Sequence, residues 1–104
     1  MPEYKIRIHS EAIDDLQKAT KWYEDQVDGL GSRFEKQVVK QINKLKTTAG
    51  IYTIRYYKVR CVVIEKLPLM IHFTIDDNHQ YVDILALFHT SRNPMIWEGR
   101  ENKE

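Results

Sequence analysis

Residues 52–88 read YTIRYYKVRCVVIEKLPLMIHFTIDDNHQYVDILALF, and they decide the fold because polar and apolar side chains alternate along much of this stretch. Alternation over about four to eight residues is typical of a half-buried strand, and a short apolar run is typical of a buried one. The pattern predicts strands at residues 52–58, 60–66, 70–75 and 81–88. Pro68 and the polar cluster at 76–80 mark turns, so we expect an antiparallel meander.

Two amphipathic helices are expected before the meander. Apolar side chains repeat three and four residues apart in residues 10–27 and again from about 30 to 47. The break DGLG at 28–31 is short, which implies an antiparallel helical hairpin. Residues 3–8 alternate and predict an N-terminal strand. The expected fold class is therefore α+β in the order β-α-α-β-β-β-β, with the hairpin packed on an antiparallel β-sheet, in a single domain over residues 1–104.

One hydrophobic core should lie between the hairpin and the sheet. The residues expected in it are Leu16, Tyr23, Phe34, Ile42, Leu45, Ile64, Phe73 and Ile84. In the strand at 70–75 the apolar side chains alternate with His72 and Thr74. That alternation assigns His72 to the polar face of the sheet.

Composition excludes several classes of site. Cys61 is the only cysteine among 104 residues, so neither an internal disulfide nor a CxxC zinc motif is possible. No stretch approaches about 18 apolar residues, and the N-terminus shows no secretory pattern, so we expect a cytoplasmic protein without a membrane partner. Turn formation explains Asp76, Asp77 and Asp83 better than metal binding does. We expect no metal site and no cofactor.

The net charge of +1 conceals an uneven distribution of charge. Residues 32–60 hold eight Lys or Arg and one acid, Glu35, between two segments that each carry an excess of acids. Four of these cations share the side of the second helix that lies opposite its apolar stripe: Arg33, Lys36, Lys40 and Lys44. Such a row is ordinarily a solvated face, and the alternative is a binding surface for an anionic partner.

The C-terminal segment reads HTSRNPMIWEGR from His89 to Arg100. It resembles the C-terminal signature of RelE/ParE-superfamily toxins, particularly the ParE-like branch often called plasmid stabilisation proteins. That signature is roughly His-x-x-Arg-x-Pro with a nearby Trp and Arg, matched here by His89, Arg92, Pro94, Trp97 and Arg100.

Other parts of the chain match the same superfamily in order. They are Trp22-Tyr23-x-x-Gln26, Gly29-Leu30-Gly31 with Phe34, Tyr57-x-x-Arg60, Lys66-Leu67-Pro68, Ile71-x-Phe73 and Asp76. The resemblance implies the toxin of a type II toxin–antitoxin system, which inhibits growth and is neutralised by a cognate antitoxin. It implies contact with DNA only indirectly, through the antitoxin complex.

The superfamily contains two activities, and the residues favour one of them. ParE-like members bind and poison DNA gyrase, whereas RelE-like members are endoribonucleases that cut mRNA in the ribosome. If the chain is RelE-like, the catalytic residues implied are Arg60, His89 and Arg92, with the arginines holding phosphate and His89 as acid or base. RelE-like nucleases tend to carry an arginine on the strand that here contains Met70, and a Tyr or His near the C-terminus, where no Tyr follows Tyr81. These departures favour the ParE-like activity.

The resemblance also implies which residues bind partners. Antitoxin tails of this superfamily typically wrap across the toxin as a helix or strand, and a basic surface suits an acidic tail. The candidate partner-binding residues are Arg33, Lys36, Lys40, Lys44, Arg92, Trp97 and Arg100.

Overall fold

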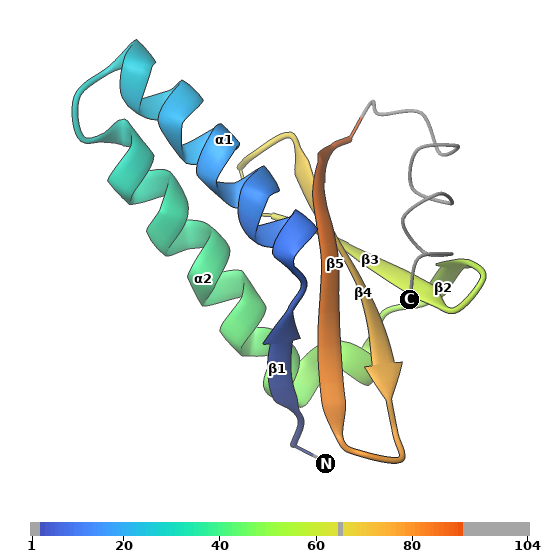
Figure 1. Ribbon diagram of the computed structural model, residues 1–104. Helices are drawn as coiled ribbons and strands as arrows, with labels where there is room; N and C mark the ends of the chain where they lie inside the picture. Colours follow the sequence, from blue (N-terminus) through green and yellow to red (C-terminus); the bar gives the residue numbers. More distant parts are fainter. Residues whose placement is uncertain (1–2, 65, 91–104) are drawn as a thin grey trace.

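A helical hairpin packs against one face of a five-stranded sheet (Figure 1). The computed structural model describes residues 3–64 and 66–90. The elements are β1 (Lys5–Ile8), α1 (Ser10–Gln26), α2 (Leu30–Thr48), the 3-10 helix η1 (Ala49–Ile51), β2 (Ile54–Tyr56), β3 (Val59–Val63), β4 (Leu69–Asp76) and β5 (Tyr81–His89). The predicted fold class and element order are confirmed. In this described part of the chain, no helix is both long and apolar enough to cross a membrane.

The strands lie in the order β1-β5-β4-β3-β2. Strands β2 to β5 form the expected antiparallel meander, but β1 runs parallel to β5, with Lys5 opposite Tyr81. The sheet is therefore mixed. Alternation of side chains reports burial and not direction, so the sequence could not give the orientation of a strand that has no turn next to its partner.

The predicted core lies between the hairpin and the sheet. Phe34, Ile42, Leu45, Ile64, Phe73 and Ile84 are all buried, while Leu16 and Tyr23 are partly buried and pack against them. The Tyr23 ring stacks on Phe34 with the ring centroids 4.6 Å apart. The apolar stripe of α2 thus meets the helix-facing side chains of β4 and β5, as the two-layer architecture requires.

The opposite face of the sheet carries a second, smaller apolar cluster. It consists of Val59, Cys61, Met70, Leu85, Ala86 and Phe88, with Tyr56 packed against it. A register shift leaves Leu85 without a partner between Ile84 and Ala86, and this β-bulge returns Leu87 to the helix side.

His72 is completely buried in this second layer, so its assignment to a polar face was wrong. Its Nδ1 lies 3.1 Å from the Tyr56 hydroxyl and 3.3 Å from the Cys61 sulfur. Strand β4 is central and covered on both faces. Under those conditions a polar side chain in an alternating pattern marks a hydrogen-bonded interior position as readily as a solvated one.

The side chain of Glu24 forms hydrogen bonds to the backbone of the turn between the helices. Gly29 has φ +87°, which favours glycine, and the Glu24 carboxylate accepts hydrogen bonds from the backbone N–H groups of Gly29 (2.8 Å) and Gly31 (2.9 Å). Glu24 therefore satisfies donors at the start of α2 that no helical carbonyl can reach. Gly31 lies so close to α1 that a Cβ atom there would be 2.6 Å from the carbonyl oxygen of Thr20.

Replacement of Gly31 with Ala should destabilise the fold by about 1–3 kcal/mol, because the backbone carbonyl of Thr20 cannot move aside without spreading the hairpin. Urea unfolding of the purified protein measures the change. Gly50→Ala is the matched control, because nothing lies within 4 Å of a Cβ atom at that position. Equal stability of the two variants would contradict the close helix contact.

Candidate functional site

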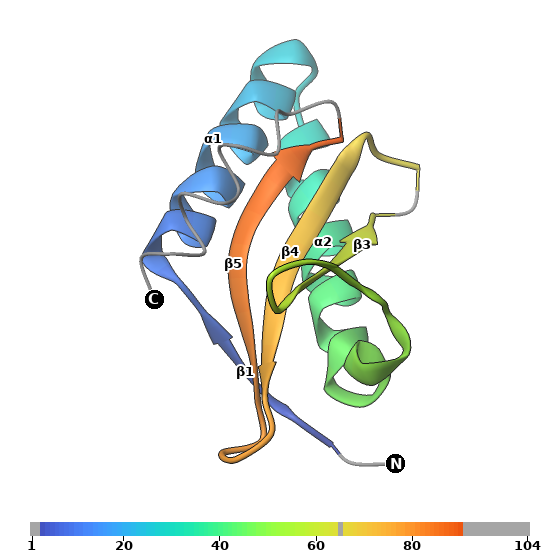
Figure 2. The same cartoon turned by 90° about the vertical axis from the view of Figure 1, so that its right-hand side faces the viewer.

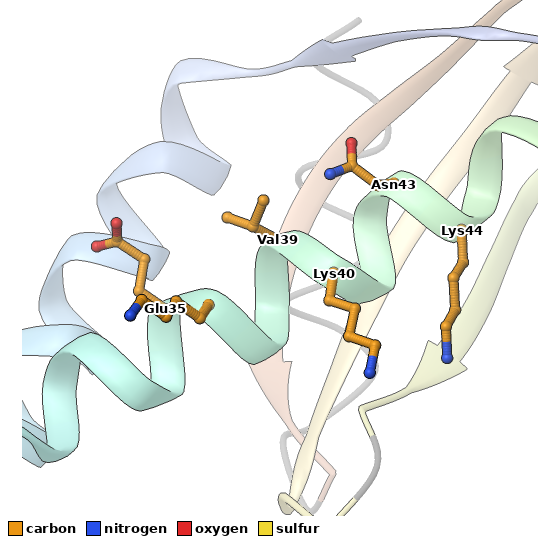
Figure 3. A pocket seen from close by; sticks show the side chains of 6 residues that line it. Glu35, Val39, Lys40, Asn43 and Lys44 are labelled. Carbon is orange, nitrogen blue, oxygen red and sulfur yellow. The ribbon is translucent and has the colours of Figure 1, made fainter.

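The outer face of α2 is exposed and basic. Arg33, Lys36, Lys40 and Lys44 are all exposed, and none of them makes an ion pair within residues 3–64 and 66–90. Lys40 and Lys44 point to the same side of the helix, whereas Val39 and Asn43 point to the other (Figure 3). The structure therefore brings together the helical residues that the sequence assigned to partner binding.

A hollow along α2 is also lined by Lys66, a cation that was not predicted to lie near this helix. It has a volume of about 350 Å³ and is lined by Arg33, Gln37, Lys40, Gln41, Lys44 and Lys66. Lys66 belongs to the turn between β3 and β4, so no helical periodicity could have linked it to α2. We call Arg33, Lys36, Lys40, Lys44 and Lys66 the basic face.

Val39 and Asn43 connect the basic face to the free edge of β1. Val39 is 44% exposed and, with Asn43, borders both an open hollow of about 750 Å³ on α2 and a second hollow of about 380 Å³ against β1. Tyr4, Ile6 and Ile8 supply the β1 side of that second hollow. The surface next to the lysines is therefore grooved and partly apolar, which suits a peptide segment.

The side chain of Arg60, a candidate catalytic residue, is hydrogen-bonded to the backbone. Its guanidinium donates hydrogen bonds to the carbonyl oxygens of Gly50 (3.4 Å) and Tyr52. These carbonyls belong to η1 and the residue after it, so Arg60 ties the end of the helical layer to β3. This role accounts for the arginine without any ligand.

Arg60 and His89 are not brought together. Arg60 is opposite Phe73 on β4, whereas His89 is opposite Leu69 at the end of the sheet. Four residues along β4 span about 13 Å and two strand spacings about 10 Å, so the two Cα atoms are roughly 16 Å apart. His89 is exposed at the end of β5. Arg92, Trp97 and Arg100 lie outside the described residues.

Acidic groups gather at the opposite end of the sheet around Arg7. The guanidinium pairs with Asp83 (2.9 Å) and Asp76 (3.4 Å) and lies 4.0 Å from the centroid of the Tyr81 ring. The hydrogen bond with Asp83 is the main reason that the pKa of Arg7 is raised. A hydrogen bond from the His79 side chain is the main cause of the lowered pKa of Asp76. These pairs hold β1 to β5 and β4, which is a structural function.

Neither metal binding nor thiol chemistry is indicated for the described residues. No group of three or more His, Cys, Asp or Glu within 3–64 and 66–90 has the arrangement to hold a metal ion. Burial raises the pKa of the Cys61 thiol to about 11, so the thiolate that would act as a nucleophile is scarce at neutral pH. The basic face remains the candidate site among the described residues.

Comparison with known proteins identifies a family and several structures with the same fold. Residues 6–94 match the family model of the ParE toxin of the type II toxin–antitoxin system parDE. The fold is shared with a chain in the chromosomal ParDE system of P. aeruginosa (18% identity, TM-score 0.70, covering 84% of this chain and 96% of that one). It is also shared with the free E. coli toxin RelE in a mutant form (12% identity, TM-score 0.70, covering 96% and 97%) and with a chain of the RelBE2 toxin–antitoxin complex of M. tuberculosis (22% identity, TM-score 0.61, covering 84% and 98%). No curated protein matches significantly.

The fold is therefore that of the RelE/ParE superfamily, whose members are toxins of type II toxin–antitoxin systems. Because the family model covers most of its length, this chain belongs to the ParE toxin family. The resemblance inferred from the sequence is confirmed at this level.

Acid should weaken the network around Arg7 through Asp76. The folded-state pKa of Asp76 is lowered, so its contribution to stability is complete above the unfolded value of about 3.9 and is lost as the pH falls through the folded value. Asp76→Asn should therefore lower the melting temperature at pH 7, and the difference from wild type should shrink below about pH 4. Thermal unfolding between pH 2.5 and 7 measures it.

Asp25→Asn is the control for this titration, because Asp25 is an exposed carboxylate on α1 without an ion pair in the described part of the chain. It should change the melting temperature little at pH 7, because no ion pair within the described part of the chain is lost. A stability difference for Asp76→Asn that is constant from pH 7 to pH 3 would contradict the assignment.

Proposed function

We propose that this toxin arrests growth by binding DNA gyrase, and that it performs no covalent chemistry of its own. The observation that carries the proposal is the separation of the nuclease candidates. Cleavage of RNA requires cations and a proton-transfer group around one phosphate. The Cα atoms of Arg60 and His89 lie roughly 16 Å apart, and the Arg60 guanidinium is hydrogen-bonded to backbone carbonyls. Binding to a protein target requires no such constellation.

The second candidate function is ribosome-dependent cleavage of mRNA. Similarity of fold to the E. coli toxin RelE favours it, and so does the sequence spacing that puts Arg92 three residues after His89. A reduced catalytic set of His89 and Arg92 would then act without Arg60. Fold alone does not select between the two activities.

The proposed neutralising partner is a cognate antitoxin with an acidic segment that lies on the basic face. The similar chain of M. tuberculosis RelBE2 was solved in a toxin–antitoxin complex. The cations of the basic face supply charge complementarity, while the hollows bordered by Val39 and Asn43 supply apolar contact. In this proposal the protein is cytoplasmic, stabilises a plasmid or chromosomal region, and reaches DNA only through the antitoxin complex.

Reversal of Lys36, Lys40 and Lys44 to Glu should slow association with the antitoxin by about 10- to 100-fold at low salt, because the surface would then repel an acidic segment. Surface plasmon resonance at several salt concentrations measures the on-rate. For a charge-matched comparison, Lys40→Glu with Lys44→Glu is set against Lys18→Glu with Lys21→Glu on α1. If both pairs associate equally fast, the lysines of α2 form only a solvated face.

Induction of the wild-type toxin without antitoxin should stop growth and leave plasmid DNA relaxed, with mRNA ends unchanged, because gyrase maintains negative supercoiling. Arg92→Ala should abolish growth arrest while antitoxin binding persists. Arg92→Lys should restore little, because lysine keeps the charge but not the planar fork that binds carboxylate or phosphate at two points. Agarose gels and mapping of mRNA 5′ ends measure the two activities.

New mRNA ends with normal supercoiling would replace gyrase inhibition with the nuclease function. Full toxicity of Arg92→Ala would remove Arg92 from the site. Urea unfolding of Arg92→Ala is the required control, since loss of toxicity through unfolding would assign the residue a structural role instead.

A further inference from the structure

The two sides of α2 differ in their chemistry. Val39 and Asn43 point to one side of the helix, and Lys40 and Lys44 point to the other (Figure 3). In the sheet below, β1 and β3 lie on either side of β5 and β4 (Figure 2). The hollow of about 380 Å³ bordered by Val39 lies against β1, whereas the hollow of about 350 Å³ bordered by Lys66 reaches the turn after β3. We call the second of these the cationic hollow.

The cationic hollow is polar on all sides that the structure describes. Its described lining consists of four cations and two carboxamides, without an acidic, aliphatic or aromatic side chain: Arg33, Gln37, Lys40, Gln41, Lys44 and Lys66. In contrast, the hollow of about 750 Å³ on α2 is bordered by Glu35 and Val39 as well as by lysines. A protein partner gains most of its binding energy from a few buried anchors, often aromatic. A phosphate group needs only cations and N–H donors, which are what the cationic hollow offers.

The four cations lie together without an acidic partner among residues 3–64 and 66–90. All of them are exposed, and none forms an ion pair there. Lys40 and Lys44 are one helical turn apart, where like charges repel each other. Arg33 and Lys44 are eleven residues apart, which is about 16 Å along the helix axis. A row of that length can face several phosphates of one strand, so it suits a polyanion better than a single small ion.

Lys66 has a backbone conformation that lysine rarely adopts. Its φ of +65° lies in the left-handed region, where glycine is the ordinary residue. The side chain is exposed, and no ion pair within the described ranges offsets the strain. Strain that is retained beside a group of like charges points to a function for this side chain outside the fold.

We infer that the cationic hollow binds the phosphate backbone of duplex DNA, with its four cations as the contacts. Single strands are bound through stacking aromatics, which the described lining lacks, so a duplex is the form that fits. Contacts to phosphate carry no sequence information, so the binding is independent of base sequence. The choice of DNA over RNA rests on the proposed function, because gyrase acts on duplex DNA, whereas the phosphate contact itself does not.

The inference adds a direct DNA contact of the free toxin to a function in which DNA is otherwise reached through the antitoxin complex. Lys40 and Lys44 border the cationic hollow and also belong to the basic face proposed for the antitoxin. An acidic antitoxin segment and a DNA duplex would therefore compete for the same cations, and binding of the antitoxin would release the toxin from DNA.

Fluorescence anisotropy with a short labelled DNA duplex tests the inference on the full chain purified from its antitoxin complex. Binding is measured over a series of salt concentrations. For the wild type, log K should fall with log salt concentration with a slope of about −3 to −4, because each of four contacts releases about 0.9 counter-ion. Lys44→Gln with Lys66→Gln should weaken binding about tenfold or more at low salt and make the slope shallower by about 2. A duplex of scrambled sequence should bind equally well.

Lys18→Gln with Lys21→Gln is the charge-matched control, because it removes two exposed cations from α1. It should change neither the affinity nor the slope appreciably. If the two pairs weaken binding equally, DNA binding follows net charge alone and the inference is overturned. Failure of the wild type to bind the duplex at low salt overturns it as well.

Lys66→Gly separates binding from stability, because glycine relieves the strained backbone while it removes the cation. This variant should melt at the wild-type temperature or above and still bind the duplex more weakly, with a slope shallower by about 1. Gln80→Gly is the matched control, since Gln80 has φ +59° in the turn between β4 and β5. It should leave DNA binding unchanged. Duplex binding by Lys66→Gly equal to that of wild type would remove Lys66 from the site and contradict the inference.

Three competitors identify the anion. Unlabelled DNA duplex should displace the probe at a lower concentration of charge than poly-aspartate does. Equal displacement by poly-aspartate would assign the cationic hollow to an acidic peptide, and tighter binding of a single strand or of an RNA duplex would remove the assignment to DNA. Each of these results overturns the inference. None of them depends on gyrase, so supercoiling and growth arrest decide the proposed function separately.

Discussion

Burial of the apolar stripe of α2 against β4 and β5 is the interaction on which the rest of the structure depends. Once Phe34, Val38, Ile42 and Leu45 face the sheet, the residues on the other side of the helix must face outward. The side that faces outward is the basic one. The same hydrophobic periodicity that fixes the core therefore also fixes where the cations are displayed.

Sequence patterns predicted those parts of the structure that depend on local periodicity. The order of the elements, the hairpin and the core residues follow from apolar spacing, because each is decided by which side of an element is buried. Features that depend on contacts between distant segments could not be found in this way. The parallel pairing of β1 with β5 and the approach of Lys66 to α2 are of this kind.

The candidate site shows the same division. The row of cations on α2 was visible in the sequence, because four residues at helical spacing share one side. The hydrogen bonds from Arg60 to the carbonyls of Gly50 and Tyr52 could not be predicted from the sequence. Whether an arginine binds a ligand or a backbone acceptor depends on which groups surround it in three dimensions. The burial of His72 was also missed, because a polar residue in an alternating strand can belong to a second buried layer on the other face of the sheet.

The pairing of β1 with β5 also governs when the protein can exist in its native form. Residues 5–8 align with residues 81–84, so the first strand cannot pair until nearly the whole chain has been synthesised. At about 5–20 residues per second, a ribosome takes several seconds to supply that neighbour, and contacts of such long sequence separation are slow to form. The sheet therefore remains incomplete while the chain is being synthesised. Translation order itself gives a co-produced antitoxin an interval in which to be present before the toxin is complete.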